Sequence, residues 1–279
     1  MRERTRRPYD GSHEPAGRHA AMTERISRDI EIDRDGLKLH GHVDGTKGAT
    51  GAPVVIAMHG FMRDLGYEDT DLLAQLAHGL VDEGFTVVRF DFNGRGRSEG
   101  AWGQSDVFNQ VEDAIAVLDY VRRVFAPASV SLLGHSQGGV IAGMVAGMYA
   151  EQVKALAMLA PAASVKDDAL RGQLLGVPFD PNRVPDTITL KDGQHAVDGK
   201  FVRIARTLPI YETAGMFKGP ALLVMGEEDR IVGRDVPNNY GAAMANCEVS
   251  LYTHLDHPFE GADRDVALGE AVQFLANHR

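Results

Sequence analysis

Short apolar runs alternate with longer segments of helical periodicity along most of this chain. Runs of four or five largely apolar residues predict buried strands at Val54–Met58, Thr86–Phe90, Val130–Leu133, Ala155–Leu159 and Ala221–Met225. Apolar residues spaced three or four apart predict helices over Asp71–Asp82, Ser105–Val124, Val140–Tyr149, Val236–Ala245 and Asp263–Asn277. Before them, the alternating stretch Asp29–Val43 is interrupted by Asp35-Gly36 and predicts a hairpin. The order indicates an α/β fold with a mostly parallel central sheet and helices on both faces.

One segment, between Pro161 and Phe217, departs from this alternation. It holds several Pro and Gly residues, scattered apolar positions and mixed charges, but no clear buried strand. We therefore expect one α/β domain over residues 26–279 with an insertion at about 162–216. Ligands of open α/β sheets bind outside the carboxyl ends of the strands, so an insertion leaving such an end is predicted to be a lid. The alternative is a surface elaboration that touches no ligand.

The amino-acid composition indicates which class of protein this is and which partners it is expected to lack. Hydrophobic residues make up 44% and charged residues 24% of the 279 positions, as in ordinary globular proteins. The net charge of -10 disfavours a nucleic-acid partner, because phosphate binding needs clustered Lys and Arg. The longest apolar runs are too short to cross a bilayer, so no membrane association is expected. Residues 1–25 lack the apolar core of a signal peptide and are predicted to be a disordered leader.

The single cysteine, Cys247, permits neither an intrachain disulfide nor a cysteine-based metal site. This usage is typical of a reducing compartment, and we expect a cytoplasmic protein that needs no metal or cofactor. The sequence leaves a homodimer open.

The most informative motif is Gly134-His135-Ser136-Gln137-Gly138, which follows a predicted strand and precedes a predicted helix. It fits G-x-S-x-G, the sharp turn that exposes a nucleophilic serine in α/β-hydrolases. A side chain at position 134 or 138 is expected to collide with the neighbouring strand or helix. The alternative is a Gly-rich junction with a bystander serine.

A serine nucleophile needs a histidine as general base and a carboxylate that orients the histidine. Asp229 follows the last predicted buried strand, and His257 stands in a loop before the final helix, which is the chain order of this fold. His254 is the rival base, although it ends a strand-like stretch. Glu227 and Glu228 are the rival acids, less favoured because Asp229 stands farther past the strand end.

Acyl transfer also needs two N–H donors for the developing oxyanion. Gln137 follows the serine and would supply one, and Phe61, in the HGF sequence after Val54–Met58, is the candidate for the other. Nearby, Gly94-Arg95-Gly96-Arg97-Ser98 combines Gly and Arg as phosphate loops do. It lacks the complete spacing of either nucleotide-binding motif, which favours a packed turn that supports the serine turn.

Taken together, HGF, DFNGRGRSEG, GHSQGG, LAPAA, LPIYE and DHPF resemble the bacterial feruloyl or cinnamoyl esterases of the α/β-hydrolase superfamily, from about Ile26 to the C-terminus. The resemblance implies hydrolysis of hydroxycinnamate esters by a triad of Ser136, Asp229 and His257. It also implies a small inserted subdomain over the pocket, whose Asp168 matches a position that meets the phenolic hydroxyl. Leu175 and Val202 stand where relatives can carry Gln and Tyr, which removes hydrogen-bond partners from the far end of the ring.

The expected function is therefore a serine esterase that acts on a small-molecule ester through an acyl-enzyme. A general carboxylesterase or acylglycerol lipase would use the same triad on aliphatic acyl groups, and Leu175 and Val202 favour it. A non-catalytic hydrolase-fold protein that only binds a small molecule is the alternative of another class, and the candidate triad disfavours it.

Overall fold

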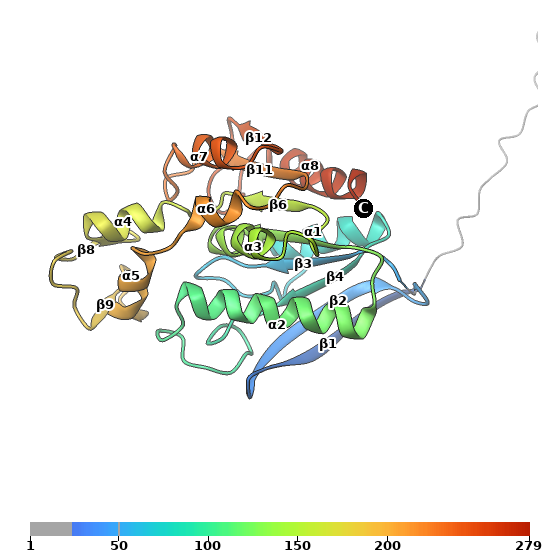
Figure 1. Cartoon of the computed structure of the whole chain (residues 1–279), viewed down its shortest axis with the longest axis horizontal. Coiled ribbons are helices and arrows are strands. Elements are labelled where there is room, and N and C mark those ends of the chain that lie inside the picture. Colours follow the sequence, from blue (N-terminus) through green and yellow to red (C-terminus); the bar gives the residue numbers. More distant parts are fainter. Residues whose placement is uncertain (1–23, 50) are drawn as a thin grey trace, which may run out of the picture.

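The computed structural model describes residues 24–49 and 51–279 (Figure 1). Most of the expected leader lies outside these residues, and β1 begins at Arg25, the last residue of that leader. The strands are β1 (Arg25–Arg34), β2 (Leu37–Thr46), β3 (Val54–Met58), β4 (Thr86–Phe90), β5 (Val130–His135), β6 (Leu156–Leu159), β7 (Gln173–Leu174), β8 (Val177–Pro178), β9 (Thr187–Thr189), β10 (Ala196–Asp198), β11 (Ala221–Gly226) and β12 (Cys247–Tyr252). The helices are α1 (Leu72–Asp82), α2 (Val107–Phe125), α3 (Gln137–Met148), α4 (Val165–Arg171), α5 (Gly199–Ala205), α6 (Ile210–Ala214), α7 (Val236–Ala243) and α8 (Arg264–Asn277).

Eight of these strands form one sheet in the order β1-β2-β4-β3-β5-β6-β11-β12. The β1–β2 hairpin turns at Asp35-Gly36 and pairs antiparallel, and β2 also runs antiparallel to β4. All further pairs, from β4 to β12, are parallel. The predicted α/β class and mostly parallel sheet are confirmed.

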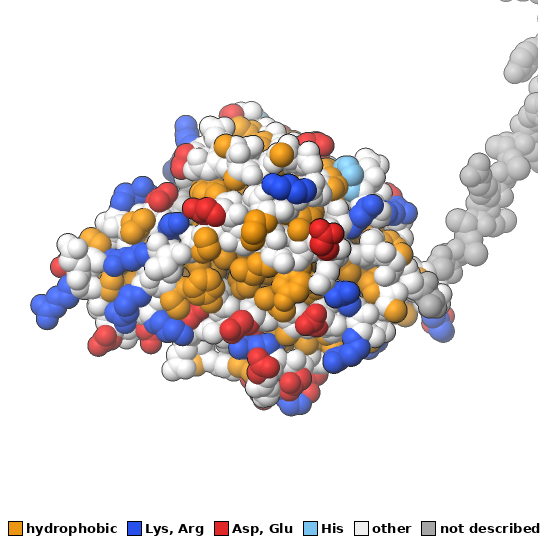
Figure 2. All heavy atoms as spheres, in the orientation of Figure 1, with side chains coloured by type: hydrophobic (Ala, Val, Ile, Leu, Met, Phe, Trp, Pro, Cys, Tyr) orange, Lys and Arg blue, Asp and Glu red, His pale blue; other side chains and the backbone are white. Residues whose placement is uncertain are grey.

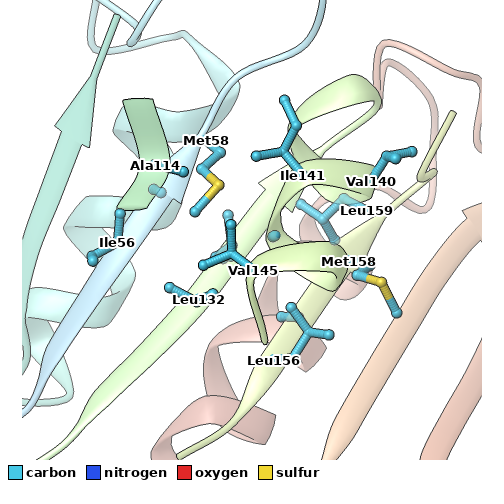
Figure 3. Close-up of a cluster of buried hydrophobic side chains, with 14 of the residues drawn as sticks. Ile56, Met58, Ala114, Leu132, Val140, Ile141, Val145, Leu156, Met158 and Leu159 are labelled. Carbon is cyan, nitrogen blue, oxygen red and sulfur yellow. The ribbon is translucent and has the colours of Figure 1, made fainter. Parts of the chain in front are cut away.

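The helices cover both faces of this sheet (Figure 1). Helix α3 contacts α2 and α6 on one face, and α1 packs beside α8 on the other. Figure 3 shows apolar side chains of β3, β5 and β6 meeting those of α3, with Val140, Ile141 and Val145 among them. Almost the whole of α3 is buried, because the sheet and the neighbouring helices enclose it. This rigid core fixes the amino end of α3.

Most of the segment between β6 and β11 lies beyond one end of the sheet, at the left of Figure 1. This inserted unit contains α4, α5 and two antiparallel pairs of very short strands, β7–β8 and β9–β10, whereas α6, at the end of the segment, packs on α3. These strands were not predicted, because two or three residues are too few to show an apolar alternation.

Charges of both signs are interspersed on the face that Figure 2 shows, so the described residues on this face gather into no continuous basic surface. Within the described ranges, no helix combines the length and the apolar content that a membrane span requires.

Candidate functional site

Ser136 occupies the turn between β5 and α3, at the carboxyl end of a central strand. Its φ of 55° and ψ of -120° form a combination that residues with a side chain adopt only under strain. The turn is held by hydrogen bonds from the Ser136 N–H to the Leu159 carbonyl (2.8 Å) and from the Ala162 N–H to the Ser136 carbonyl (3.0 Å). These bonds fix the serine between β5 and the segment that follows β6.

The glycines on both sides of Ser136 permit this close packing. A Cβ on Gly134 would collide with the Gly138 carbonyl and lie 2.6 Å from the Gly139 nitrogen. A Cβ on Gly138 would collide with the Met58 carbonyl at the end of β3 and lie 2.6 Å from the His59 carbonyl oxygen. Side chains are thus excluded at both positions by backbone atoms, which cannot move aside as a flexible side chain could.

The structure brings Ser136, His257 and Asp229 into one hydrogen-bonded chain. Ser136 Oγ lies 2.8 Å from His257 Nε2, and His257 Nδ1 lies 2.8 Å from Asp229 Oδ2. The Asp229 carboxylate also accepts from the backbone N–H groups of Ile231 and Val232. Such a chain can remove the serine proton and stabilise the resulting imidazolium.

The rival residues lie apart from this chain. The His254 side chain is 66% exposed, and its Nδ1 lies 3.5 Å from Glu228 Oε1 instead of near the serine. Glu227 and Glu228 are both exposed. The geometry therefore favours Asp229 and His257 over their sequence neighbours.

Burial and hydrogen bonds together shift the pKa values of Asp229 and His135. Burial raises the pKa of Asp229, but the hydrogen bond with His257 and the two backbone N–H groups outweigh it, so the net pKa is below the ordinary value. His135 is fully enclosed, and burial together with the neighbouring His257 lowers its pKa to about 3. Its Nε2 lies 2.8 Å from the His257 carbonyl oxygen, so a neutral His135 holds the histidine loop by donating a hydrogen bond.

The two candidate oxyanion residues, Phe61 and Gln137, line the same cavity as Ser136. Among the described residues, no protein atom accepts from the backbone N–H of either one. The Gln137 side chain instead donates to Gln110 of α2. Two free amides beside a serine hydroxyl can bind a negatively charged oxygen.

Sequence reasoning missed the support of this loop by His59. Its Nδ1 lies 2.7 Å from the Gly60 carbonyl oxygen, and its Nε2 accepts from the Phe92 N–H at 3.1 Å. Burial lowers the pKa of His59 to about 3, so its ring is neutral and Nδ1 is the donor. The only signal in the sequence is the position of His59 directly after an apolar strand.

The Gly94–Ser98 motif forms a packed turn, as predicted, but it packs against the oxyanion loop. Arg95 Nε donates to the Phe61 carbonyl at 2.9 Å, and its Nη1 donates to the Trp102 carbonyl at 2.6 Å. Buried Asp91 accepts from the Arg97 and Leu65 N–H groups. Arg95 is turned into the protein and is 3% exposed, which leaves no anion-binding loop here.

A cavity of about 320 Å³ extends from Ser136 to the insertion. Its walls are largely apolar and include Phe61, Ala162, Val165, Leu174, Leu175, Phe201 and Ile231. Asp168 of α4 is its one carboxylate, and this group accepts hydrogen bonds from Gln173 Nε2 (2.7 Å) and Arg171 Nη2 (2.8 Å). Leu175 lines the cavity as expected, whereas Val202 is fully buried and is not one of the lining residues. The neighbour of Val202, Phe201, takes that place.

No group of three or more potential metal ligands occurs in the part of the chain that the structure describes.

A family model of the serine aminopeptidases, S33, matches residues 51–191. Two structures of Est1E from Butyrivibrio proteoclasticus, one with ferulic acid bound, are similar, with TM-scores of 0.83 and 0.80 at 27% and 25% identity. They cover 89% and 90% of this chain and 98% of each Est1E chain.

Curated relatives match less of their own length. An uncharacterized Mycobacterium tuberculosis protein is 24% identical over 203 residues, which are 72% of this chain and 50% of that protein. The bifunctional esterase/perhydrolase DCH of Acinetobacter calcoaceticus is 35% identical over 92 residues, 33% of this chain and 30% of that protein. The chain thus spans about half the length of the first curated relatives that it matches, and less of DCH. Because the family model covers half of its residues and the fold agrees, the chain belongs to the S33 serine aminopeptidase family of α/β-hydrolases.

Proposed function

We propose that this protein is a serine esterase that works by acyl transfer. The observation that carries the proposal is the chain from Ser136 Oγ through His257 to Asp229, with both distances at 2.8 Å. His257 removes the serine proton as Ser136 attacks the ester carbonyl, and Asp229 stabilises the charged imidazole. His257 then protonates the leaving alcohol, and water attacks the acyl-enzyme with the same base.

The oxyanion formed in both steps is held by the N–H groups of Phe61 and Gln137. Among the described residues neither amide has a protein acceptor, so no hydrogen bond has to break when the charge develops. Loss of one such donor typically costs on the order of 100- to 1000-fold in rate.

The acyl group we propose is a hydroxycinnamate. A cavity of about 320 Å³ with apolar walls suits an aromatic acyl chain, and the Asp168 carboxylate can accept from a phenolic hydroxyl. Est1E, which is similar over 89% of this chain, binds ferulic acid. Gln173, missed by sequence reasoning, donates to the Asp168 carboxylate and so helps to hold it in place. We further propose that the insertion acts as a lid, because α4 and α5 contribute to this cavity.

A second candidate is an esterase of aliphatic acyl groups. Its support is the apolar rim of the same cavity, where Met62 is 43%, Leu175 39% and Ile231 50% exposed. A flexible aliphatic acyl group can pack on this rim, and it needs no hydrogen-bond partner there.

Steady-state hydrolysis of methyl ferulate, methyl cinnamate and short p-nitrophenyl alkanoates separates the two candidates. We expect a higher kcat/KM for methyl ferulate than for the alkanoates, and Ser136→Ala to lose on the order of a millionfold in kcat. Ser250→Ala is the matched control, because it removes a hydroxyl of β12 that donates to Glu270 of α8 and does not line the cavity. A higher kcat/KM for the alkanoates would replace the acyl-group proposal.

Asp168→Ala tests recognition of the ring. We expect kcat/KM for methyl ferulate to fall about tenfold, the effect of one hydrogen bond, while that for methyl cinnamate, which lacks the hydroxyl, stays unchanged. The exposed neighbour Asp167→Ala controls for the loss of a charge on α4. Equal effects on both esters would refute this role. A fluorophosphonate that fails to label Ser136 would overturn the esterase proposal itself.

A further inference from the structure

Arg95 is a buried cation that faces carbonyl groups and aromatic rings instead of an acid. Its side chain donates to three carbonyl oxygens, those of Phe61 (2.9 Å), Trp102 (2.6 Å) and Gly94 (3.3 Å). It forms no ion pair with any residue in the described ranges. Burying a guanidinium is costly, and burial lowers the pKa of Arg95 to about 10. Placing a charge here therefore needs a functional reason.

One of the Arg95 contacts lies on the oxyanion loop itself, at the Phe61 carbonyl. The carbonyls of Gly60 and Phe61 are consecutive, and two side chains hold them: the adjacent His59 on the first and Arg95, from a distant segment, on the second. The Phe61 N–H lies in the same peptide plane as the Gly60 carbonyl, so the His59 contact sets its direction. Arg95 holds the next peptide plane, and the two planes together fix the position of the Phe61 Cα atom between them. Neither His59 nor Arg95 is among the residues that line the cavity beside Ser136.

The same guanidinium also fixes the side chain of Phe61. Its central carbon lies 5.1 Å from the centre of the Phe61 ring and 4.2 Å from that of Trp102, and the two rings meet edge to face at 5.5 Å. The Phe61 ring lines the cavity and packs on Phe201 of the insertion. A cation held against aromatic faces resists rotation of those rings.

We propose that Arg95 is a positioning residue for the oxyanion, because it holds the Phe61 carbonyl and ring and so keeps the Phe61 N–H at the place where it binds the tetrahedral intermediate. It does not contact the substrate. The inference rests on the proposed esterase function, since it assumes that the Phe61 amide binds an oxyanion. Its buried positive charge also favours the negative oxygen over the neutral carbonyl from which it forms.

The test compares a ligand that has the tetrahedral oxygen with one that lacks it. Styrylboronic acid forms a tetrahedral adduct with a serine oxygen, whereas coniferyl alcohol offers the ferulate ring without a carbonyl. Both inhibition constants and kcat/KM for methyl ferulate are measured for wild type, Arg95→Ala and Arg95→Lys. Arg97→Ala is the control, because that arginine lies two residues away, is 60% exposed and packs over Tyr67. Arg95→Lys keeps a cation and provides the test if Arg95→Ala does not fold.

We expect Arg95→Ala to lose on the order of 100-fold in kcat/KM and the same factor in boronate affinity, the typical effect of displacing a reacting group by about 1 Å. Coniferyl alcohol should lose far less affinity than the boronate in Arg95→Ala, Arg95→Lys should lose less than Arg95→Ala, and Arg97→Ala should match wild type. Unchanged boronate affinity, or an equal loss for both ligands, would overturn the role of Arg95 and leave the esterase intact. A wild type that neither hydrolyses esters nor binds the boronate would overturn both proposals.

Discussion

The strained backbone of Ser136 lowers the stability of the folded protein, and substitutions at this position can measure by how much. A residue in so sparse a region of φ and ψ carries on the order of 1–3 kcal/mol of strain, which glycine does not feel. Ser136→Gly and Ser136→Ala both lose the hydroxyl bond to His257, so their difference isolates the backbone. Glycine has greater conformational freedom in the unfolded chain, which lowers the stability of the glycine variant by roughly 0.5–1 kcal/mol. The glycine variant should therefore be more stable than the alanine variant by about 1 kcal/mol.

Thermal unfolding followed by circular dichroism suits this comparison, because 1 kcal/mol corresponds to a Tm difference of about 2–4 °C for a domain of this size. Ser164 provides the matched control, since its φ of -61° and ψ of -13° are ordinary for any residue. There, Ser164→Gly should be less stable than Ser164→Ala by about 0.5–1 kcal/mol. If Ser136→Gly is no more stable than Ser136→Ala, the strain argument is wrong.

Three more outcomes can be checked. Asp229→Asn should lower kcat by about 10⁴-fold with little change in fold, because the imidazole then favours the wrong tautomer; rates and circular dichroism decide this. Gly138→Ala should reduce kcat/KM on the order of 100-fold, since its Cβ collides with the Met58 carbonyl and displaces the neighbouring amide; a value near wild type would contradict the collision. Below pH 6.5, stability should fall toward pH 3 by about 1.4 kcal/mol per pH unit for each of His59 and His135, because only the unfolded rings take up protons there. Urea unfolding at several pH values tests this, and a flat profile would contradict it.

Sequence patterns predicted the parts of the fold that local rules control. Strand β3 has the predicted bounds, and β4 does too, because runs of apolar residues bounded by polar ones mark strands buried on both faces. The start of α3 was predicted at Val140, but the helix begins at Gln137. Gly138 and Gly139 show no apolar periodicity and have poor helix propensity, which packing against β3 overrides.

Contacts between distant segments could not be predicted in the same way. The sequence indicated that Ser136, Asp229 and His257 follow strand ends, and the parallel sheet then brings these ends to one edge. No comparable rule places Arg95 on the Phe61 carbonyl or Gln173 on Asp168, since each depends on the path of an irregular loop.

The position of Trp102 makes its fluorescence sensitive to changes in the cavity and in the insertion. It is the only tryptophan among the 279 residues, and its ring lies over Arg95, beside Phe61 and 4.5 Å from the His195 ring of the insertion. A ligand entering the cavity changes the surroundings of Phe61, and a displacement of the insertion changes those of His195. Tryptophan emission therefore gives an unlabelled signal with which stopped-flow mixing can time ligand entry and compare it with the rate of ester cleavage.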